Sequence, residues 1–170
     1  MKILVSSDTH KSLDLAEKAL LPQCPADLLI HLGDYVEDGQ ELSKRLGIPL
    51  KAVRGDNDFC PGDTELVLEC DGVRIFLCHG HSCNIDEGLE EIYREAKRRQ
   101  ARLALFGHSH EPKIEARDGV VMLNPGNLCL AEKKNSFAVV RIERPKIILG
   151  IFNPNQKGFI DVREIPACPG

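Results

Sequence analysis

The sequence predicts an α/β fold in which a β-α-β-α-β first half precedes a set of antiparallel strands. In the first half, short apolar runs that favour β-structure alternate with segments of helical spacing. After Pro112 the pattern changes to short alternating runs separated by turn residues. The chain has 170 residues, the size of one ordinary domain, and its sequence shows no repeat or linker. We therefore predict one domain, residues 1–170, with a single shared core.

Near-continuous apolar runs predict five strands that are buried on both faces. They cover residues 2–6, 28–32, 50–54, 73–78 and 103–106. Helices are predicted for residues 12–20, 38–46 and 86–100. The third helix has the clearest pattern, because apolar residues from Leu89 to Ala96 share one face and the charges run from acidic at its start to basic at its end.

The composition argues against two classes of partner. With 26 acidic and 22 basic residues the net charge is -4, which gives no electrostatic attraction to nucleic acid in general or to anionic membranes. No apolar run approaches the roughly 20 residues of a membrane span. We expect a cytoplasmic protein without a membrane partner. Apolar residues such as Ile148 and Ile151 could form a homo-oligomer interface, although a core strand is the preferred interpretation.

The seven cysteines include no C-x-x-C pair, which argues against a disulfide framework and a structural zinc knuckle. Most of them are interpreted as small core residues. Cys78 and Cys83 could bind a soft metal, but we favour a core thiol for the first and a loop thiol for the second.

Histidines and aspartates gather after the predicted strands. All six histidines lie at or next to the C-terminal end of an apolar run, and Asp8, Asp34 and Asp56 occupy the same kind of position. Ligands bind at this edge in open α/β sheets. We therefore expect a polar site where the strands end.

Two motifs place a pair of these side chains two residues apart. They are Asp8-Thr9-His10 and His108-Ser109-His110. On an extended backbone both side chains of a pair point to the same side, so each pair is expected to reach one point. His31, three residues before Asp34 and within a strand, is instead interpreted as a packed or supporting residue.

Carboxylate and imidazole groups together suit borderline divalent cations better than calcium. Seven candidate ligands are too many for one tetrahedral centre, so we predict two divalent metal ions that share a bridging carboxylate. Manganese is the expected metal, with nickel, iron and zinc as alternatives. The candidate ligands are Asp8, His10, Asp34, Asp56, His79, His108 and His110.

Five short motifs follow one another between residues 8 and 110. They read Asp8-x-His10, Gly33-Asp34, Gly55-Asp56-Asn57-Asp58, His79-Gly80-His81 and Gly107-His108-x-His110. In this order they resemble the signature of the calcineurin-like metallophosphoesterase superfamily, over residues 1–127. The sequence is most similar to the small bacterial and archaeal phosphodiesterases of that superfamily, in its chain length, its Val53-Arg54-Gly55 lead-in, its His79-Gly80-His81 element and its Asn124-Pro125-Gly126. Those enzymes share ancestry with the scaffold subunit of the retromer coat. The resemblance implies a four-layer α/β/β/α sandwich of two mixed sheets flanked by helices.

The resemblance also implies how the ligands divide between the metals. One metal would be held by Asp8, His10, Asp34 and His110. The second would be held by Asp34, Asp56, His79 and His108, with Asp34 as the bridge. In this superfamily a metal-bridging hydroxide attacks phosphorus, so the implied activity is that of a dimetal-dependent phosphodiesterase. Its substrate would be a small-molecule or nucleotide phosphodiester.

Two residues depart from the common pattern of the superfamily. Asp56 stands in place of an asparagine, and its negative charge should tighten metal binding and favour phosphodiesters over phosphomonoesters. Asn57 stands where larger members have a histidine that assists the leaving group, and an amide cannot supply a proton. Activity should therefore concentrate on good leaving groups. His81 could take over as an acid or phosphate contact, or it could face solvent.

The predicted catalytic residues are Asp34, Asn57 and His81. The intact ligand pairs and the bridging Asp34 favour an enzyme. The alternative is a non-catalytic metal-binding scaffold resembling the retromer subunit, because a carboxylate at the position of Asp56 also occurs in retromer-like relatives.

Overall fold

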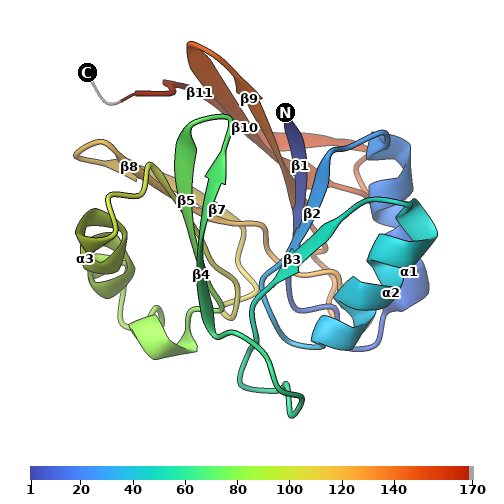
Figure 1. The fold of residues 1–170 in the computed structure, drawn as a ribbon. Coiled ribbons are helices and arrows are strands. Elements are labelled where there is room, and N and C mark those ends of the chain that lie inside the picture. The colour runs from blue at the N-terminus through green and yellow to red at the C-terminus, as the bar shows by residue number, and fades with distance from the viewer. Residues whose placement is uncertain (169–170) are drawn as a thin grey trace.

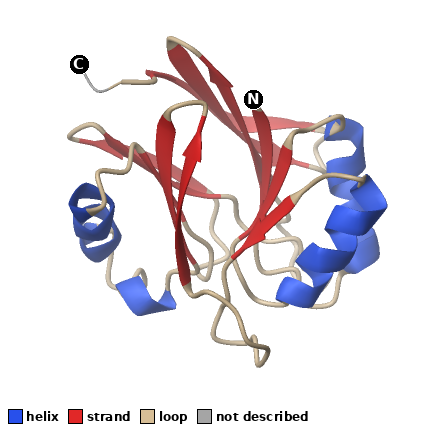
Figure 2. Ribbon diagram, viewed as in Figure 1, coloured by secondary structure: helices blue, strands red, loops and turns tan. Residues whose placement is uncertain are grey.

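Two β-sheets pack face to face between two layers of helices (Figure 1). The computed structural model describes residues 1–168, so residues 169 and 170 of the predicted domain lie outside the described residues. Helices α1 (Leu13–Leu20) and α2 (Val36–Leu46) cover the outer face of one sheet, and α3 (Glu90–Arg98) covers the other (Figure 2). The predicted four-layer α/β/β/α sandwich is confirmed.

The first sheet has six strands in the order β11-β10-β9-β1-β2-β3. They are β1 (Lys2–Ser6), β2 (Leu28–His31), β3 (Leu50–Ala52), β9 (Phe137–Glu143), β10 (Lys146–Asn153) and β11 (Gly158–Pro166). Strands β1 to β3 are parallel and are connected through α1 and α2, which confirms the predicted β-α-β-α-β unit. Strands β9 to β11 extend this sheet in antiparallel fashion.

The second sheet has five strands in the order β4-β5-β6-β8-β7. They are β4 (Glu65–Cys70), β5 (Val73–Cys78), β6 (Leu103–Leu105), β7 (Lys113–Arg117) and β8 (Val120–Asn124). The pairs β5–β6 and β6–β8 are parallel, and β4 and β7 are antiparallel edge strands. The expectation that the strands after Pro112 are all antiparallel is therefore wrong for β8, which is buried along its whole length beside β6.

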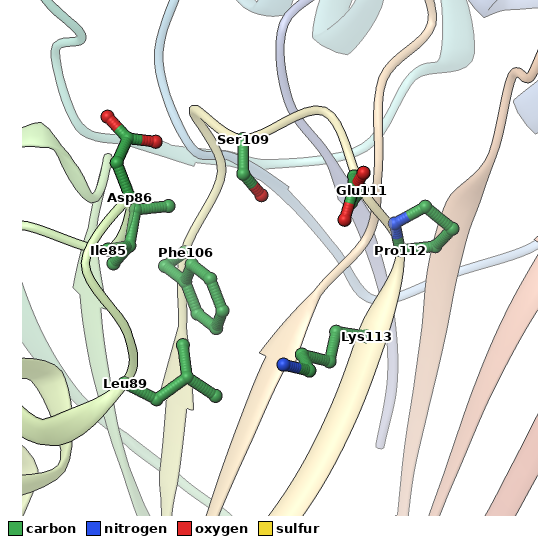
Figure 3. A pocket seen from close by; sticks show the side chains of 8 residues that line it. All are labelled: Ile85, Asp86, Leu89, Phe106, Ser109, Glu111, Pro112 and Lys113. Carbon is green, nitrogen blue, oxygen red and sulfur yellow. The ribbon is translucent and has the colours of Figure 1, made fainter.

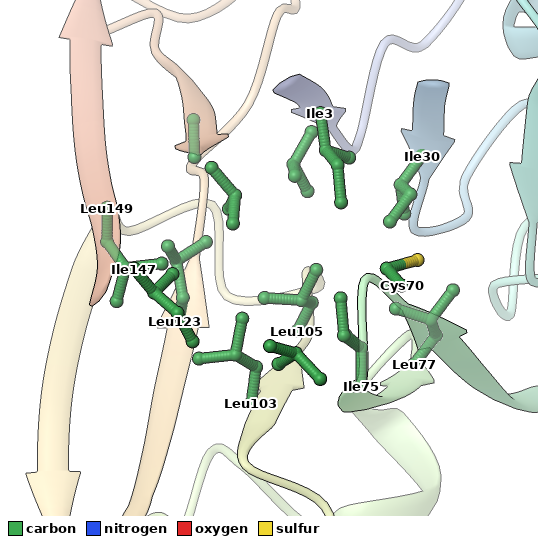
Figure 4. Close-up of a cluster of buried hydrophobic side chains, with 14 of the residues drawn as sticks. Ile3, Ile30, Cys70, Ile75, Leu77, Leu103, Leu105, Leu123, Ile147 and Leu149 are labelled. Atoms are coloured by element: carbon green, nitrogen blue, oxygen red, sulfur yellow. The ribbon is translucent and has the colours of Figure 1, made fainter. Parts of the chain in front are cut away.

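The core between the sheets is built by side chains from both of them (Figure 4). Ile3 of β1 and Ile75 of β5 belong to this cluster. Successive residues of a strand point to opposite faces, so the neighbouring Leu4 and Phe76 turn outward into the clusters on the helical sides of the two sheets. This double burial explains why β1 and β5 are apolar in nearly every position.

Some helices and strands differ from their predicted bounds. Helix α3 begins at Glu90 rather than at residue 86, because Gly88 has a φ of +133° and breaks the helical path. Helix α2 begins at Val36, two residues earlier than predicted, because the distant Asp58 carboxylate accepts its backbone N–H at 2.8 Å. Strand β4 was not predicted, since Glu65 and Glu69 leave an apolar run of only three residues between them on a half-exposed edge strand.

Two short 3₁₀ helices lie in the connections, η1 (Leu21–Gln23) and η2 (His81–Cys83). Helix η2 follows β5 after two residues and carries His81. Among residues 1–168, no helix has both the length and the apolar character required to cross a membrane.

Candidate metal centre

Five loops bring the candidate ligands together at one edge of the two sheets. Asp8 and His10 follow β1, Asp34 follows β2, Asp56 follows β3, His79 follows β5, and His108 and His110 follow β6. Because these strands end at the same edge, side chains that are up to about a hundred positions apart in the sequence meet there.

Three of these side chains form the Asp8 group, which consists of Asp8, His10 and His110. One potential ligand atom from each residue lies within 4.8 Å of the others. Nε2 of His110 is 3.3 Å from Oδ1 of Asp8 and 3.4 Å from Nε2 of His10. Asp8 is fully buried, whereas both histidines are partly exposed.

A second set forms the Asp56 group, which consists of Asp56, His79 and His108. Oδ1 of Asp56 is 3.1 Å from Nε2 of His79 and 3.3 Å from Nδ1 of His108. The buried member is His79, and the carboxylate is the exposed one.

Asp34 lies between the two groups. Its Oδ1 is 3.4 Å from Nε2 of His79, and its Oδ2 is 3.6 Å from Nε2 of His10. The side chain of Asn57 donates to Oδ2 at 2.7 Å, and the backbone N–H of Asn57 donates to Oδ1 at 3.1 Å. Asn57 therefore holds the carboxylate of Asp34 in its position between the two groups.

The pair His108 and His110 does not reach one point, so that expectation is wrong. His108 belongs to the Asp56 group and His110 to the Asp8 group. The expectation assumed an extended backbone, whereas φ is +69° at His108 and +58° at His110, so the side-chain alternation of a strand does not apply there. Asp8 and His10 do share a group, but they also reach it from a left-handed backbone.

Left-handed backbone is concentrated among the candidate ligands. Five of the seven have positive φ: Asp8, His10, Asp34, His108 and His110. Such conformations cost of order 1–3 kcal/mol each in non-glycine residues and persist where the surrounding structure enforces them. Their accumulation indicates that the fold positions these side chains for a function.

Two glycines allow the loops to approach the aspartates closely. A Cβ atom on Gly55 would lie 2.1 Å from Oδ1 of Asp34, and one on Gly107 would lie 2.8 Å from Oδ2 of Asp8. Neither distance is tolerable for a real side chain. Any larger residue at these positions would displace a candidate ligand.

Two buried atoms of the centre lack a hydrogen-bond partner within residues 1–168, namely Oδ1 of Asp8 and Nε2 of His79. Nε2 of His79 is near Asp56, but the geometry is not that of a hydrogen bond. A buried polar atom left unpaired costs about 1–3 kcal/mol. Ligation would satisfy both atoms, and carboxylate oxygen with imidazole nitrogen is a donor set that fits borderline divalent cations.

The charges within the centre favour its ionised carboxylates. Burial alone would raise the pKa of the Asp8 carboxyl, but His110 and His79 beside it hold that pKa below its usual range. In return, the Asp8 carboxylate raises the pKa of His110, with a further contribution from Glu132. Partial burial alone would raise the pKa of Asp56, but the backbone N–H of Asp56 itself and the nearby His79 lower that pKa below its usual value. Ionised carboxylates are the form that binds a cation.

Sequence reasoning missed the role of Asp58. Its buried carboxylate accepts backbone N–H groups from Gly55 at 2.8 Å, from Asp34 at 2.9 Å and from Val36 at 2.8 Å. These bonds join the loop that carries Asp34 to the loop that carries Asp56. The signal in the sequence was an acidic residue inside a ligand motif with no ligand role of its own.

Two further carboxylates were also missed, and they face the outer nitrogens of the His108 and His110 rings. Oδ2 of Asp86 is 3.3 Å from Nε2 of His108, and Oε1 of Glu132 is 3.7 Å from Nδ1 of His110. A carboxylate in this position fixes the tautomer and orientation of a metal-binding imidazole. Both carboxylates come from loops far from the histidines in sequence, so no local motif predicts these contacts.

His81 lies beside the Asp56 group and is partly exposed. Its ring centroid is 5.5 Å from that of His79, and its Nδ1 is 3.9 Å from Oδ1 of Asp56. Burial and the neighbouring His79 lower the pKa of His81. The ring is therefore in reach of a molecule that occupies the centre.

Two cavities flank the loop that carries His108 and His110. The larger has a volume of about 1140 Å³, and both histidines line it together with Lys133 and Lys134. The smaller, about 350 Å³, has an apolar wall that includes Phe106, and its lining contains none of the seven candidate ligands (Figure 3). The larger cavity has room for a small-molecule ester next to the centre.

Known proteins resemble this chain in sequence and in fold. The probable metallophosphoesterase YsnB of Bacillus subtilis is 33% identical over 150 residues, which cover 84% of this chain and 85% of YsnB. Phosphodiesterase MJ0936 of Methanocaldococcus jannaschii is 27% identical over 157 residues, which cover 76% of this chain and 85% of that protein. Vacuolar Protein Sorting 29 from Cryptosporidium parvum matches with a TM-score of 0.83 at 19% identity over 97% of both chains, a likeness of fold alone.

The family comparison covers most of the chain. Residues 1–145 match the model of the calcineurin-like phosphoesterase superfamily domain, and this range contains all seven candidate ligands. The predicted enzyme class, a metal-dependent phosphoesterase, is confirmed at the level of the family. The chain therefore belongs to the calcineurin-like phosphoesterase superfamily.

Proposed function

We propose that this protein is a dimetal phosphodiesterase that hydrolyses small-molecule or nucleotide phosphodiesters with good leaving groups. The observation that carries the proposal is the position of Asp34, whose two oxygens face His79 on one side and His10 on the other. The name of the relative from Methanocaldococcus jannaschii, a phosphodiesterase, supports the same substrate class.

The residues present fit two cations. Asp8, His10 and His110 would hold one with an oxygen of Asp34, and Asp56, His79 and His108 would hold the other with the second oxygen. When bound, a pair of divalent cations supplies an attacking water at neutral pH and neutralises charge on the phosphoryl group.

Asn57 and its neighbour Asp58 position the candidate ligand Asp34, and Asn57 cannot act as an acid toward the leaving group. Asn57 and Asp58 fix the orientation of Asp34 through hydrogen bonds to its carboxylate and its backbone. An amide such as that of Asn57 can donate a hydrogen bond to an ester oxygen but cannot give it a proton. Because proton donation typically contributes about 10²- to 10⁴-fold, esters with poor leaving groups should react slowly. We assign proton donation, where it occurs, to His81, whose Nδ1 is 3.9 Å from Oδ1 of Asp56.

The charge of the metal centre favours phosphodiesters over phosphomonoesters as substrates. Asp56, a carboxylate in place of the asparagine that the resemblance implies, lowers the charge of the centre by one unit, and Asp86 and Glu132 add negative charge beside it. The Coulomb energy scales with the product of the charges, so the loss is larger for a dianionic monoester than for a monoanionic diester.

Metal-stripped protein resupplied with manganese, nickel or zinc tests the proposal. We expect hydrolysis of a para-nitrophenyl phosphodiester to return with metal and to exceed hydrolysis of the matched monoester. Dialkyl phosphodiesters should react far more slowly than the aryl ester. Asp161→Asn, a change on the edge strand β11, is the control and should behave as the wild type.

Two results would count against the proposal, and a third would remove only His81 from it. Tight binding of two cations without turnover of any ester would favour a non-catalytic scaffold. A clear preference for the monoester would overturn the charge argument. An unchanged diesterase rate in His81→Ala would remove His81 from the reaction and leave the rest of the proposal standing.

A further inference from the structure

Two cysteines enclose the His79-Gly80-His81 element. Cys78 is the last residue of β5 and Cys83 is the last residue of η2, and their sulfur atoms are 3.9 Å apart. Gly80, with a φ of +123°, turns the chain back, and its carbonyl accepts the backbone N–H of Cys83 at 2.8 Å. The two thiols therefore face each other across a turn of six residues that contains a candidate metal ligand.

We propose that Cys78 and Cys83 are a reversible dithiol–disulfide site, and that its oxidation displaces His79 and His81 and weakens cation binding by the Asp56 group. The disulfide itself depends only on the two thiols. The effect on cation binding rests on the proposed function.

The pair is reachable from one side. Cys78 is fully buried, whereas Cys83, although only 2% exposed, lines a cavity of about 460 Å³ that lies along α3 beside the end of η2. Three arginines and three glutamates share this lining, and Arg99 pairs with Glu65 and Glu95. The cavity is thus nearly neutral and suits a small uncharged oxidant such as hydrogen peroxide.

Cys83 is the thiol placed to react first. It lines the cavity, and the Cys78 thiol beside it lowers the pKa of Cys83 despite burial. Thiolate character and access together determine which cysteine is oxidised. Cys78 has no contact with that cavity and can only follow as the second partner.

The chemistry balances with a hydroperoxide as oxidant. The Cys83 thiolate attacks one peroxide oxygen, the O–O bond breaks, and the products are a sulfenic acid on Cys83 and, after protonation, one water. The Cys78 sulfur then attacks the Cys83 sulfur, and the hydroxide that leaves takes the Cys78 proton as a second water. Two thiols lose two electrons and two protons in total, and an added dithiol reverses the reaction.

Disulfide formation requires movement. The sulfurs must approach from 3.9 Å to about 2.05 Å, a change of about 1.9 Å. Cys78 is held in β5 by its pairing with Glu65, so most of the movement falls on the segment from His79 to Cys83. Metal ligation tolerates changes of only about 0.2 Å in distance, so the Asp56 group should lose affinity.

Mass spectrometry of the metal-free full-length protein tests the disulfide. The protein is treated with hydrogen peroxide, its free thiols are alkylated, and trypsin releases the peptide of residues 75–94, which contains these two cysteines and no other. We expect a peptide that has lost two hydrogen atoms and carries no alkyl group. Prior treatment with dithiothreitol should return two alkyl groups to it.

Calorimetric titration with manganese or zinc tests the coupling. The oxidised protein should bind a cation at the Asp56 group about 10-fold more weakly or worse, the scale on which disturbance of ligand support acts. Cys83→Ala should abolish both the mass change and the sensitivity of metal binding to peroxide. Cys70→Ala, a buried cysteine on the neighbouring strand β4, is the matched control and should retain both.

The outcomes separate the two claims. Two alkylated cysteines in the peptide after peroxide would overturn the redox site. A disulfide that leaves cation affinity unchanged would overturn the coupling. If the reduced protein binds no cation at all, the proposed function fails, whereas the mass measurement still decides whether the cysteine pair is a redox site.

Discussion

The Asp8 group and the Asp56 group offer similar donors but differ in where the carboxylate lies. The Asp8 side chain is 0% exposed, on the turn after β1, whereas the Asp56 side chain is 44% exposed, on the loop after β3. Attraction between a carboxylate and a cation is stronger where water is excluded, and an unpaired buried carboxylate is costly. The Asp8 group should therefore hold its cation tightly, and the Asp56 group should bind a second cation that exchanges more readily.

Replacing Asp34 should have the largest effect, because this residue faces both groups. For Asp34→Asn we expect the diesterase rate to fall by about 10³-fold, the scale on which loss of a principal electrostatic contact acts. Steady-state rates and metal content by elemental analysis check this. Loss of rate with two cations still bound at full affinity would contradict the bridging position.

Replacing one aspartate of each group by asparagine tests whether the two groups differ in cation affinity. Asp8→Asn should weaken the tighter of two binding events, and Asp56→Asn should weaken the other. Because Asp56→Asn restores one unit of positive charge, it should also raise the rate on the monoester relative to the diester. Calorimetric titration and paired rate measurements check both expectations. Equal losses in both variants would mean that burial of the carboxylate does not distinguish the groups.

Replacing the carboxylates that support His108 and His110 should lower metal affinity less, and in one group at a time. Asp86→Asn acts on His108 and Glu132→Gln acts on His110. Partners of this kind typically contribute 10- to 100-fold to metal affinity, but both are well exposed, Asp86 by 73%, so we expect about 10-fold or less. Each variant should affect only the group of its own histidine, and added salt should reduce the difference.

The pH dependence of the Asp8 group should be the smallest effect. The pKa of His110 is raised by Asp8, so in the metal-free protein His110 stays protonated to a higher pH than in an unfolded chain. Its contribution to stability is therefore complete below its unfolded pKa and is lost as the pH rises through the folded value. A cation must displace this proton, so affinity at the Asp8 group should rise with pH across the same window. Titration in buffers of different ionisation enthalpy should show proton release on binding, and no release would contradict the prediction.

Features that depend on a local pattern of residue types could be predicted from the sequence. The apolar run of β1, the glycines before Asp34 and Asp56, and the clustering of histidines after strands could all be interpreted locally. The contacts of Asp58 could not, because its partners Val36 and Asp34 lie more than twenty positions away. The left-handed backbone at His108 and His110 could not be predicted either, because an H-x-H motif does not reveal positive φ values.

The most direct test of two linked metal groups is anomalous X-ray diffraction from crystals grown with manganese. We expect two anomalous peaks about 3.5–4 Å apart, one beside Asp8 and one beside Asp56, with Asp34 in contact with both. A single peak, or two peaks that do not share Asp34, would mean that the two groups are not linked through Asp34.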